Sequence, residues 1–340
     1  MFFASIHIYQ GRKVMSHMKI LVILPNWLGD AVMATPAIEL LALHYENAKF
    51  TFLGSHVSIE ALKYHPLCEK AIVDETKKAS NRLLATYKLA QELGSFSLAV
   101  SFRNQFYSSL LLRLTQTVVC VSRSSWHSMF LLSHTPKIST NQHLVKQYAQ
   151  LAMTDVHDYH GEVSRLKLYI EPTRHNNPTL GINAGATYGS AKRWYPERFA
   201  QVAHEYSDKF DVIIFGGPNE VEMANEIETL LKNLGTQNYM NLAGKTNIRE
   251  LCSNIAGCSL FITNDSGPMH VAAAYQVPTI AIFGPTKYKE TSQWMNEKSK
   301  IIRHEMECSP CMKRECPLKH HDCMKSVTAL EVIEAVKKLN

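Results

Sequence analysis

Short apolar runs alternate with amphipathic stretches along this chain, and that pattern constrains the fold more than any other feature. Nine runs are predicted to be buried strands, at residues 19–24, 50–53, 71–73, 98–102, 118–121, 180–183, 212–215, 260–263 and 279–283. Helical stretches separate them, as at residues 31–45 (interrupted early at Thr35-Pro36), 83–93, 196–206 and 221–234. Apolar strands between helices are typical of parallel sheets covered on both faces, so we predict an α/β fold.

A polar segment from Pro172 to Pro178 interrupts the alternation, which then restarts. The length of 340 residues also suggests two domains. We predict a first domain over residues 18–171, a linker at 172–178, a second domain over 179–327, and a C-terminal helix within 328–340 that folds back onto the first domain. Two doubly wound domains in sequence imply a central cleft, with ligands at the carboxyl ends of the strands.

The composition, 46% hydrophobic and 19% charged, is that of an ordinary soluble globular protein. No apolar stretch reaches the length that spans a bilayer. Residues 1–17 make a poor signal peptide, and Met18 begins a clean strand, so we expect residues 1–17 to be an extension. Eight cysteines without a secretion signal favour reduced thiols in the cytosol.

The net charge of +6 permits attraction to an anionic membrane or an acidic substrate without requiring either. No basic block interleaved with aromatic residues indicates nucleic-acid binding.

The first strand ends at a turn that contains Gly29 and Asp30. Gly29 permits a tight turn, and the charge of Asp30 is favourable at a helix start, where it could serve only as a cap. Alternatively, Asp30 is a carboxylate that faces the cleft and acts as a general base.

A second junction, residues 183–194, is rich in Gly, Ala, Ser and Thr. Small residues let backbone amides approach a diphosphate, and Thr187 and Ser190 add hydroxyl donors. Lys192 supplies a point charge and Arg193 a bidentate fork. A solvated basic loop is the alternative, and the surrounding small residues favour phosphate contact.

Two further junctions carry ligand candidates. Gly216 and Gly217 end a buried strand, and Glu220 and Glu222 follow, either as helix caps or as acceptors of ribose hydroxyls. In the turn after residues 260–263, Asp265 or Ser266 is expected to cap a helix, and Gly267 to let the backbone approach a ligand. A helix start of this kind suits phosphate.

Several classes of enzyme are disfavoured by missing motifs. No G-x-G-x-x-G fingerprint follows a strand, and no Walker A loop, HExxH motif or nucleophile elbow occurs. A nucleotide-diphosphate site that faces a single carboxylate across a cleft instead fits group transfer from an activated sugar.

Five segments, residues 18–38, 181–199, 215–220, 241–246 and 263–274, resemble the ADP-heptose:lipopolysaccharide heptosyltransferases of glycosyltransferase family 9, most of all the type II enzymes. The resemblance covers nearly the whole chain from Met18 onward. It implies a GT-B fold of two Rossmann-like domains facing a central cleft, and an inverting mechanism without a catalytic metal or a cofactor. It also implies transfer from ADP-heptose of the second heptose onto heptosyl-Kdo-lipid A. Transfer of the first heptose to Kdo, a sugar-nucleotide epimerase on the same scaffold and a non-catalytic binding protein are the alternatives.

The same resemblance implies roles for individual residues. Asp30 matches the catalytic base, Lys192 and Thr187 the donor-phosphate contacts, and Glu220 or Glu222 the ribose contact. The full set of expected donor-binding residues is Thr187, Ser190, Lys192, Arg193, Gly216, Gly217, Glu220, Glu222, Asp265, Ser266, Gly267 and His270. The acceptor is expected to contact Asn26, Trp27 and Arg103.

An acceptor of this kind is an anionic glycolipid of the inner leaflet. We therefore expect a cytoplasmic protein, peripheral at the inner face of the inner membrane, with exposed basic or apolar residues on its first domain. Candidates for this surface are Lys77, Lys78, Arg103 and Arg123.

Four cysteines near the C-terminus are closely spaced: Cys308, Cys311, Cys316 and Cys323, with His320 and His321 between the last two. The spacing C-x2-C-x4-C-x6-C predicts a compact structural metal site. Reduced thiols in a surface loop are the alternative.

Overall fold

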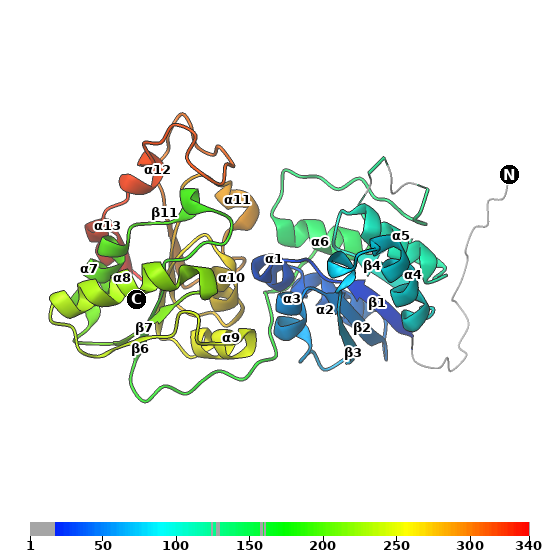
Figure 1. Cartoon of the computed structure of the whole chain (residues 1–340), viewed down its shortest axis with the longest axis horizontal. Helices are drawn as coiled ribbons and strands as arrows, with labels where there is room; N and C mark the ends of the chain where they lie inside the picture. Colours follow the sequence, from blue (N-terminus) through cyan, green and yellow to red (C-terminus); the bar gives the residue numbers. More distant parts are fainter. Residues whose placement is uncertain (1–17, 124, 127–129, 157–158, 160, 340) are drawn as a thin grey trace.

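The computed structural model describes residues 18–123, 125–126, 130–156, 159 and 161–339, so the predicted extension at 1–17 lies outside the described residues. Two parallel sheets, each flanked by helices, lie side by side along the longest axis of the molecule (Figure 1). The α/β class with two doubly wound domains is confirmed.

The first domain is built on a five-stranded sheet with the order β3-β2-β1-β4-β5, and all its strand pairs are parallel. Its elements are β1 (Lys19–Ile23), α1 (Leu28–Met33), α2 (Thr35–His44), β2 (Lys49–Gly54), α3 (His56–Leu62), β3 (Cys68–Val73), the 3-10 turn η1 (Thr76–Lys78), α4 (Arg82–Leu93), β4 (Leu98–Ser101), α5 (Phe106–Leu114), β5 (Val119–Val121) and α6 (Leu144–Ala152).

The second domain is built on a six-stranded parallel sheet with the order β11-β10-β9-β6-β7-β8. Its elements are β6 (Thr179–Asn183), η2 (Ser190–Lys192), α7 (Pro196–Tyr206), β7 (Asp211–Phe215), η3 (Pro218–Glu220), α8 (Val221–Asn233), β8 (Tyr239–Asn241), α9 (Ile248–Ala256), β9 (Leu260–Asn264), α10 (Gly267–Ala274), β10 (Thr279–Ile282), α11 (Tyr288–Thr291), β11 (Ser299–Ile302), α12 (Asp322–Lys325) and α13 (Ala329–Lys337).

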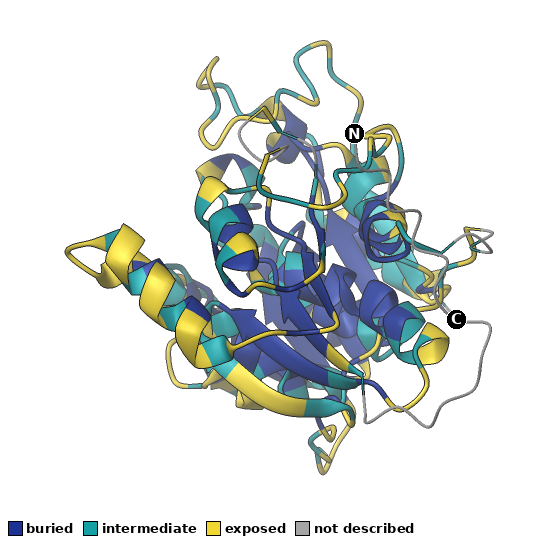
Figure 2. Ribbon diagram, turned by 90° about the vertical axis from the view of Figure 1, so that its right-hand side faces the viewer, coloured by how far each residue is buried: buried dark blue, intermediate teal, exposed yellow. Residues whose placement is uncertain are grey.

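Helices cover both faces of each sheet. The central strands are therefore buried on both sides, and their sequences are continuous apolar runs. Figure 2 shows the central strands in the buried class, whereas the edge strand β3 is largely exposed, and exposed residues lie on the outer faces of the helices. All nine predicted strands are present. Two edge strands, β8 and β11, were not predicted, because they are short and only partly buried and so lack a clear apolar pattern.

The helix predicted over residues 31–45 is divided in two. The first part, α1, begins at Leu28, and α2 restarts at Thr35 with Pro36 in its first turn. Proline has no N–H to donate to the preceding turn, which explains the division.

The expectation that the C-terminal helix folds back onto the first domain is wrong. Helix α13 packs on α7 and near β10 and β11 of the second domain. The hydroxyl of Tyr206 donates a hydrogen bond of 2.8 Å to the carbonyl of Ile333, which fastens α13 to α7.

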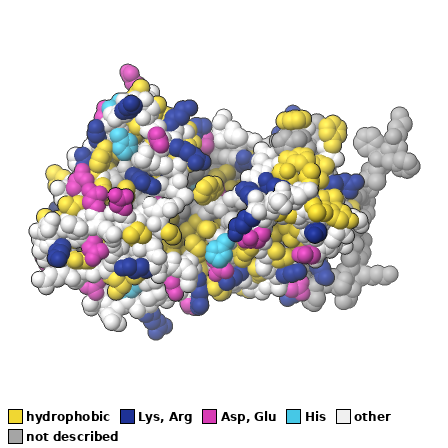
Figure 3. Space-filling view, viewed as in Figure 1, with side chains coloured by type: hydrophobic (Ala, Val, Ile, Leu, Met, Phe, Trp, Pro, Cys, Tyr) yellow, Lys and Arg dark blue, Asp and Glu magenta, His cyan; other side chains and the backbone are white. Residues whose placement is uncertain are grey.

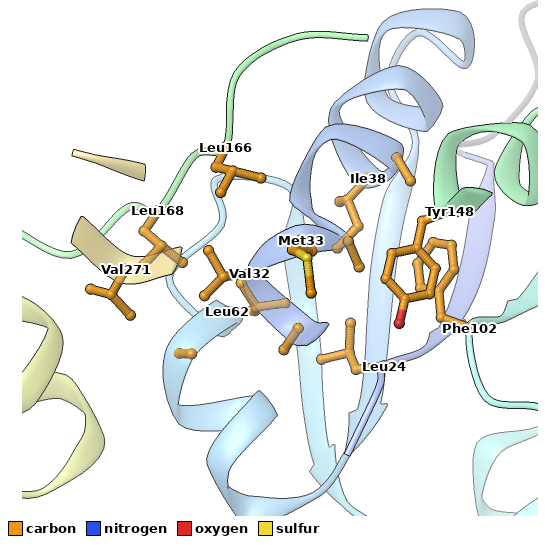
Figure 4. Close-up of a cluster of buried hydrophobic side chains, with 14 of the residues drawn as sticks. Leu24, Val32, Met33, Ile38, Leu62, Phe102, Tyr148, Leu166, Leu168 and Val271 are labelled. Atoms are coloured by element: carbon orange, nitrogen blue, oxygen red, sulfur yellow. The ribbon is translucent and has the colours of Figure 1, made fainter. Parts of the chain in front are cut away.

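The two domains share packed residues rather than touching only through a linker. Helix α1 packs against α10, and α3 against α9. Val271 of α10 joins a hydrophobic core that also contains Val32 and Leu168 of the first domain (Figure 4). In the part of the chain that the structure describes, no helix has both the length and the apolar character to cross a bilayer.

Candidate active site at the domain junction

Asp30 lies in the first turn of α1, directly after the carboxyl end of β1, and its side chain is half-buried. Burial raises the pKa of Asp30 above its ordinary value, and a hydrogen bond from Tyr148 and the positive charge of Lys192 offset part of that rise. A carboxylate whose pKa is raised accepts protons more readily, which suits a general base.

The partner of Asp30, Tyr148, comes from α6 and was not anticipated from the sequence. Its hydroxyl lies 3.5 Å from Oδ1 of Asp30, and its ring packs edge-on against Phe102 at 5.2 Å (Figure 4). Burial raises the pKa of Tyr148 well above 10, so the hydroxyl stays protonated and donates to the carboxylate. No sequence signal marks this pair, because 118 residues separate the two positions.

Helix α1 of the first domain and α10 of the second meet at glycines. A Cβ atom on Gly29 would lie 2.8 Å from the ring of His270 and 3.2 Å from Cα of Gly267. A Cβ atom on Gly267 would lie 3.2 Å from the backbone nitrogen of Gly29. The lack of a side chain at Gly267 lets α1 approach closely, and the expected approach of a ligand to its backbone stays a prediction. Both glycines therefore bring Asp30 to the start of α10.

His270 lies one turn into α10 and is 3% exposed. Burial lowers its pKa to about 3, and the neighbouring His143 and Lys192 act in the same direction, so the imidazole is neutral. Its Nδ1 atom has no hydrogen-bond partner among the described residues. His270 therefore adds a neutral imidazole beneath α1 at the junction.

The side chain of Lys192, in η2, pairs with the carboxylate of Asp265. The sequence had suggested that both residues contact the donor. The Nζ atom of Lys192 lies 2.6 Å from Oδ2 of Asp265, and the same oxygen accepts a 2.6 Å hydrogen bond from Thr286. Asp265 is 4% exposed, so it acts as a buried counter-ion that holds the ammonium group at the site. Because Lys192 also influences the pKa of Asp30, a positive charge lies within electrostatic reach of the carboxylate across the domain junction.

Ser266 occupies the N-cap position of α10, but its side chain does not cap the helix. Its hydroxyl instead accepts a 3.2 Å hydrogen bond from the amide of Asn183 and lies 3.1 Å from the hydroxyl of Thr263. The expected capping by Asp265 or Ser266 is therefore wrong, and the free N–H groups at the start of α10 have no side-chain cap. Such a start suits an anion.

Two asparagines at strand ends order the loop that was predicted to bind phosphate. Asn183 ends β6 and donates to the carbonyl of Gly185 at 3.1 Å, and Asn264 ends β9 and accepts from the backbone N–H of Trp194 at 3.1 Å. Both asparagines are buried at the carboxyl end of an apolar strand. A polar residue directly after an apolar run is visible in the sequence, so this pattern could have identified them as site residues.

The predicted phosphate loop presents its hydroxyls outward. Thr187 and Ser190 are exposed, whereas Arg193 is half-buried and its Nε atom has no partner among the described residues. The loop thus combines two exposed hydroxyls, a half-buried guanidinium and the fixed ammonium group of Lys192.

The two acids after β7 lie in different environments. The carboxylate of Glu220 accepts a 2.8 Å hydrogen bond from the backbone N–H of Gly217. Its carboxyl atoms also lie so close to Gly185 that a Cβ atom added there would be only 2.0–2.2 Å away from them. Gly216 is buried beside it, with Ala243 opposite. Glu222, one residue into α8, is exposed. Of the two acids, Glu220 lies against the phosphate loop.

The expected acceptor residues divide into two kinds. Trp27 is 55% exposed beside Asp30, and Asn26 is half-buried, with its carbonyl accepting from Ser55. Arg103 is not open to an acceptor, because it is 5% exposed and its Nη1 atom lies 2.7 Å from Asp74. Its Nε atom donates to the carbonyl of Leu24 at 2.6 Å, so Arg103 is a structural tie between strand ends.

The four clustered cysteines line one small cavity with His320 and His321. All are free, and within the described residues no three His, Cys, Asp or Glu side chains stand where they could share a metal ion. Cys323 is buried in α12, whereas Cys308, Cys311 and Cys316 are half-exposed, and both ring nitrogens of His321 are bonded elsewhere. The described geometry therefore shows the four thiols around one cavity without a formed ligand group, and the metal site stays a prediction with reduced thiols as its alternative.

The site thus places the carboxylate of Asp30 on the first domain opposite three features of the second domain. These are the ammonium group of Lys192, the uncapped start of α10 and the loop of small residues that follows β6. Fixed donors of this kind are suited to stabilising an anionic leaving group without reorganisation, and a carboxylate opposite them is suited to accepting a proton. In the space-filling view the surface is recessed between the two domains, with hydrophobic side chains at the bottom (Figure 3).

Comparison with known proteins bears directly on this arrangement. The sequence profile of glycosyltransferase family 9 (heptosyltransferase) matches residues 86–321. Two relatives named lipooligosaccharide heptosyltransferase 2, from two strains of Campylobacter jejuni, are 39% and 40% identical to the chain. Each match covers 95% of this chain, and 99% and 98% of the respective relatives.

Solved structures agree in fold. Escherichia coli ADP-heptose lipopolysaccharide heptosyltransferase II superposes with a TM-score of 0.79 at 24% identity, covering 95% of this chain and 98% of that one. The E. coli heptosyltransferase WaaC with ADP superposes with a TM-score of 0.77 at 17% identity, covering 95% and 100%. The GT-B arrangement is therefore confirmed, and the chain belongs to glycosyltransferase family 9, the heptosyltransferases.

Proposed function

We propose that this protein transfers L-glycero-D-manno-heptose from ADP-heptose to the inner core of lipooligosaccharide, adding the second heptose to heptosyl-Kdo-lipid A. The relatives at 39% and 40% identity carry the name heptosyltransferase 2, which supports this acceptor. A solved structural neighbour is titled with ADP and another with ADP-2-deoxy-2-fluoro heptose, which supports the donor.

One observation carries the mechanism: α1 meets the start of α10 at Gly29 and Gly267, so Asp30 stands at the domain junction next to the segment in which Asp265 pairs with Lys192. In the proposed step, a heptose hydroxyl of the acceptor attacks the anomeric carbon of the donor as its proton passes to Asp30. The new C–O bond forms as the bond from the anomeric carbon to the diphosphate oxygen breaks, and ADP leaves with the electron pair. Attack opposite the leaving group inverts the anomeric centre.

The donor side is proposed to use Lys192, the hydroxyls of Thr187 and Ser190, and the start of α10 at Ser266 and Gly267. Charge develops on ADP as it departs, and deletion of one such donor group costs about 3 kcal/mol in comparable sites. Because the ammonium of Lys192 is already held by Asp265, it does not have to be ordered when the donor binds. No metal or cofactor is needed in this scheme.

An assay with ADP-heptose and two acceptors tests the proposal. Product is expected with heptosyl-Kdo-lipid A and not with Kdo-lipid A, and the activity should persist in EDTA. Transfer to Kdo-lipid A alone would assign the first heptose instead. Isomerisation of ADP-heptose without any acceptor, or binding without turnover, would overturn transfer altogether.

A further inference from the structure

The loop between β11 and α12, residues 303–321, follows a strand end at the same sheet edge as the rest of the donor side. The phosphate loop (residues 183–194) follows β6, and Asp265 follows β9 of the same parallel sheet. The carboxyl ends of parallel strands meet at one edge, so all three segments lie there. In Figure 1 the β11–α12 loop is the orange to red segment at the top of the second domain. The reaction proposed above uses no residue of this loop.

Two hydrogen bonds fasten the β11–α12 loop to the phosphate loop. The backbone N–H of Ala191 donates to the carbonyl of Arg314 at 3.0 Å, and the hydroxyl of Tyr188 donates to the carbonyl of Met312 at 2.7 Å. The approach is so close that a Cβ atom on Gly189 would lie 2.2 Å from the carbonyl oxygen of Arg314. The glycine therefore lets the two loops pack backbone against backbone next to η2.

The β11–α12 loop is also tied to the segment that follows β10. The backbone N–H of Met312 donates to the carbonyl of Pro285 at 2.9 Å. The next residue, Thr286, donates to the carboxylate of Asp265, the partner of Lys192. The loop is thus anchored on two sides to segments that build the donor side of the site.

The side chain of Arg314 lies against the phosphate loop. Its guanidinium carbon is 5.6 Å from the centroid of the Tyr188 ring, and the Nζ atom of Lys192 is 4.8 Å from the same centroid. Both cations therefore flank one aromatic ring at cation–π distance. Arg314 is exposed and forms no ion pair within the part of the chain that the structure describes.

The charge balance of the donor side calls for such a cation. The ammonium group of Lys192 is matched by the carboxylate of Asp265 at 2.6 Å, and the neutral His270 adds no charge. A diphosphate is multiply charged, and its charge grows as the nucleotide departs. Cations without a carboxylate partner are therefore needed beside Lys192. Arg193 of the phosphate loop is one candidate, and Arg314 is a second that no pattern in the sequence marks.

We propose that Arg314 binds the diphosphate of the sugar nucleotide, which makes the β11–α12 loop a part of the donor site. A guanidinium group can donate two parallel hydrogen bonds to phosphate oxygens, so it suits this ligand better than an ammonium group does. Arg314 binds and neutralises the diphosphate and takes no proton in the reaction. The inference rests on the proposed function in its choice of ADP as the nucleotide.

Three variants of the full chain test the proposal. Arg314→Gln removes the cation, and Arg314→Lys keeps the charge but not the planar fork. Lys313→Gln removes the neighbouring charge and is the matched control, because both side chains are exposed on the same loop. The hydrogen bonds between the two loops use the backbone of Arg314 and not its side chain, so they remain available in the variants. Calorimetry measures the binding of ADP and of adenosine, and thermal unfolding without ligand checks the fold.

We expect Arg314→Gln to bind ADP at least ~10-fold more weakly than the wild type, because hydrogen bonds to a charged group are lost. Arg314→Lys should have an intermediate affinity for ADP. The affinity for adenosine and the unfolding temperature should stay unchanged in all variants, since neither involves the diphosphate. Lys313→Gln should bind ADP as the wild type does.

Unchanged ADP affinity in Arg314→Gln would overturn the proposal. An equal loss of ADP affinity in Lys313→Gln would also overturn it, because the effect would then come from the general charge of the loop. A parallel loss of adenosine affinity, or a lower unfolding temperature, in Arg314→Gln would assign the residue a role in folding instead.

Transfer assays on the same preparations separate this inference from the proposed function. If the wild type transfers heptose and Arg314→Gln keeps the wild-type KM for ADP-heptose, the proposed function stands and the inference is wrong. If ADP binding depends on Arg314 but no acceptor receives heptose, the inference stands and the proposed function is wrong. A wild type that binds no ADP would overturn both.

Discussion

The hydroxyl of Tyr148 lies 3.5 Å from the carboxylate of Asp30, so a helix late in the first domain contacts the residue assigned as the base. Tyr148 of α6 is buried against Phe102, and burial raises its pKa so far that the hydroxyl stays protonated near neutral pH. Its effect is to lower the pKa of Asp30 against the larger opposing effect of burial. Tyr148 is therefore a positioning residue that sets the pH range in which Asp30 is ionised.

The variant Tyr148→Phe should move the acid limb of the pH profile of kcat/KM to higher pH. Removing the hydrogen bond removes an influence that lowers the pKa of Asp30, so the carboxylate protonates at a higher pH and activity is lost sooner as pH falls. Tyr206→Phe, which removes a hydrogen bond to Ile333 in the second domain, is the control. An acid limb that does not move would show that Tyr148 has only a packing role.

Lys192→Ala should raise KM for ADP-heptose and lower kcat together, with a loss of about 10²-fold in kcat/KM. The reason is that, in the proposed mechanism, the ammonium group contacts the diphosphate both before and during its departure. Lys337→Ala on α13, which breaks an exposed pair with Glu334, should leave both constants unchanged. Unchanged donor affinity and rate in Lys192→Ala would remove this lysine from the site.

Glu220→Gln should raise KM for ADP-heptose roughly tenfold, since a carboxylate bonds to ribose hydroxyls more strongly than an amide does. Glu222→Gln is the comparison, and it should have little effect because Glu222 is exposed on α8, away from the phosphate loop. The reverse order of the two effects would assign the ribose contact to Glu222.

Arg103→Met should lower the free energy of unfolding by about 3 kcal/mol, because Asp74 would be left without its cation. Burial acts to raise the pKa of Asp74, but the hydroxyl of Thr76 and the charge of Arg103 lower it overall. The ionised Asp74 therefore stabilises the fold above its unfolded pKa of about 4, and this contribution is lost as pH falls through the lower folded value.

Thermal or denaturant unfolding from pH 7 down to below pH 4 measures the difference in unfolding free energy between the wild type and Arg103→Met. This difference should become smaller at the acidic end of the range. Arg165→Met is the control, because its pair with Glu297 is exposed and should contribute less than about 1 kcal/mol. A similar small loss for Arg103→Met would mean that the guanidinium is not a structural tie.

The architecture was predictable because strands buried on both faces are continuous apolar runs, and the second half of the chain repeats the pattern of the first. The edge strands β8 and β11 escaped prediction because one side of an edge strand lacks a neighbour and tolerates polar residues. The position of α13 was also mispredicted, since an amphipathic helix at the end of a chain does not specify which domain it covers.

At the site, the sequence indicates which residues follow strand ends but not how they pair. The carboxyl ends of parallel strands meet at one edge, so charged residues there are candidates both for a ligand and for one another. Arg103 and Asp74 pair with each other, and so do Lys192 and Asp265. Gly267 likewise packs against Gly29 of a neighbouring helix, a contact between domains that the sequence does not reveal.

The most direct test of the account is the rate of heptose transfer by Asp30→Asn, measured with ADP binding on the same preparation. The account predicts that ADP binds as in the wild type while turnover falls by at least ~10²-fold, because the amide cannot take the proton of the acceptor hydroxyl. Normal turnover in Asp30→Asn would contradict the assignment of Asp30 as the base.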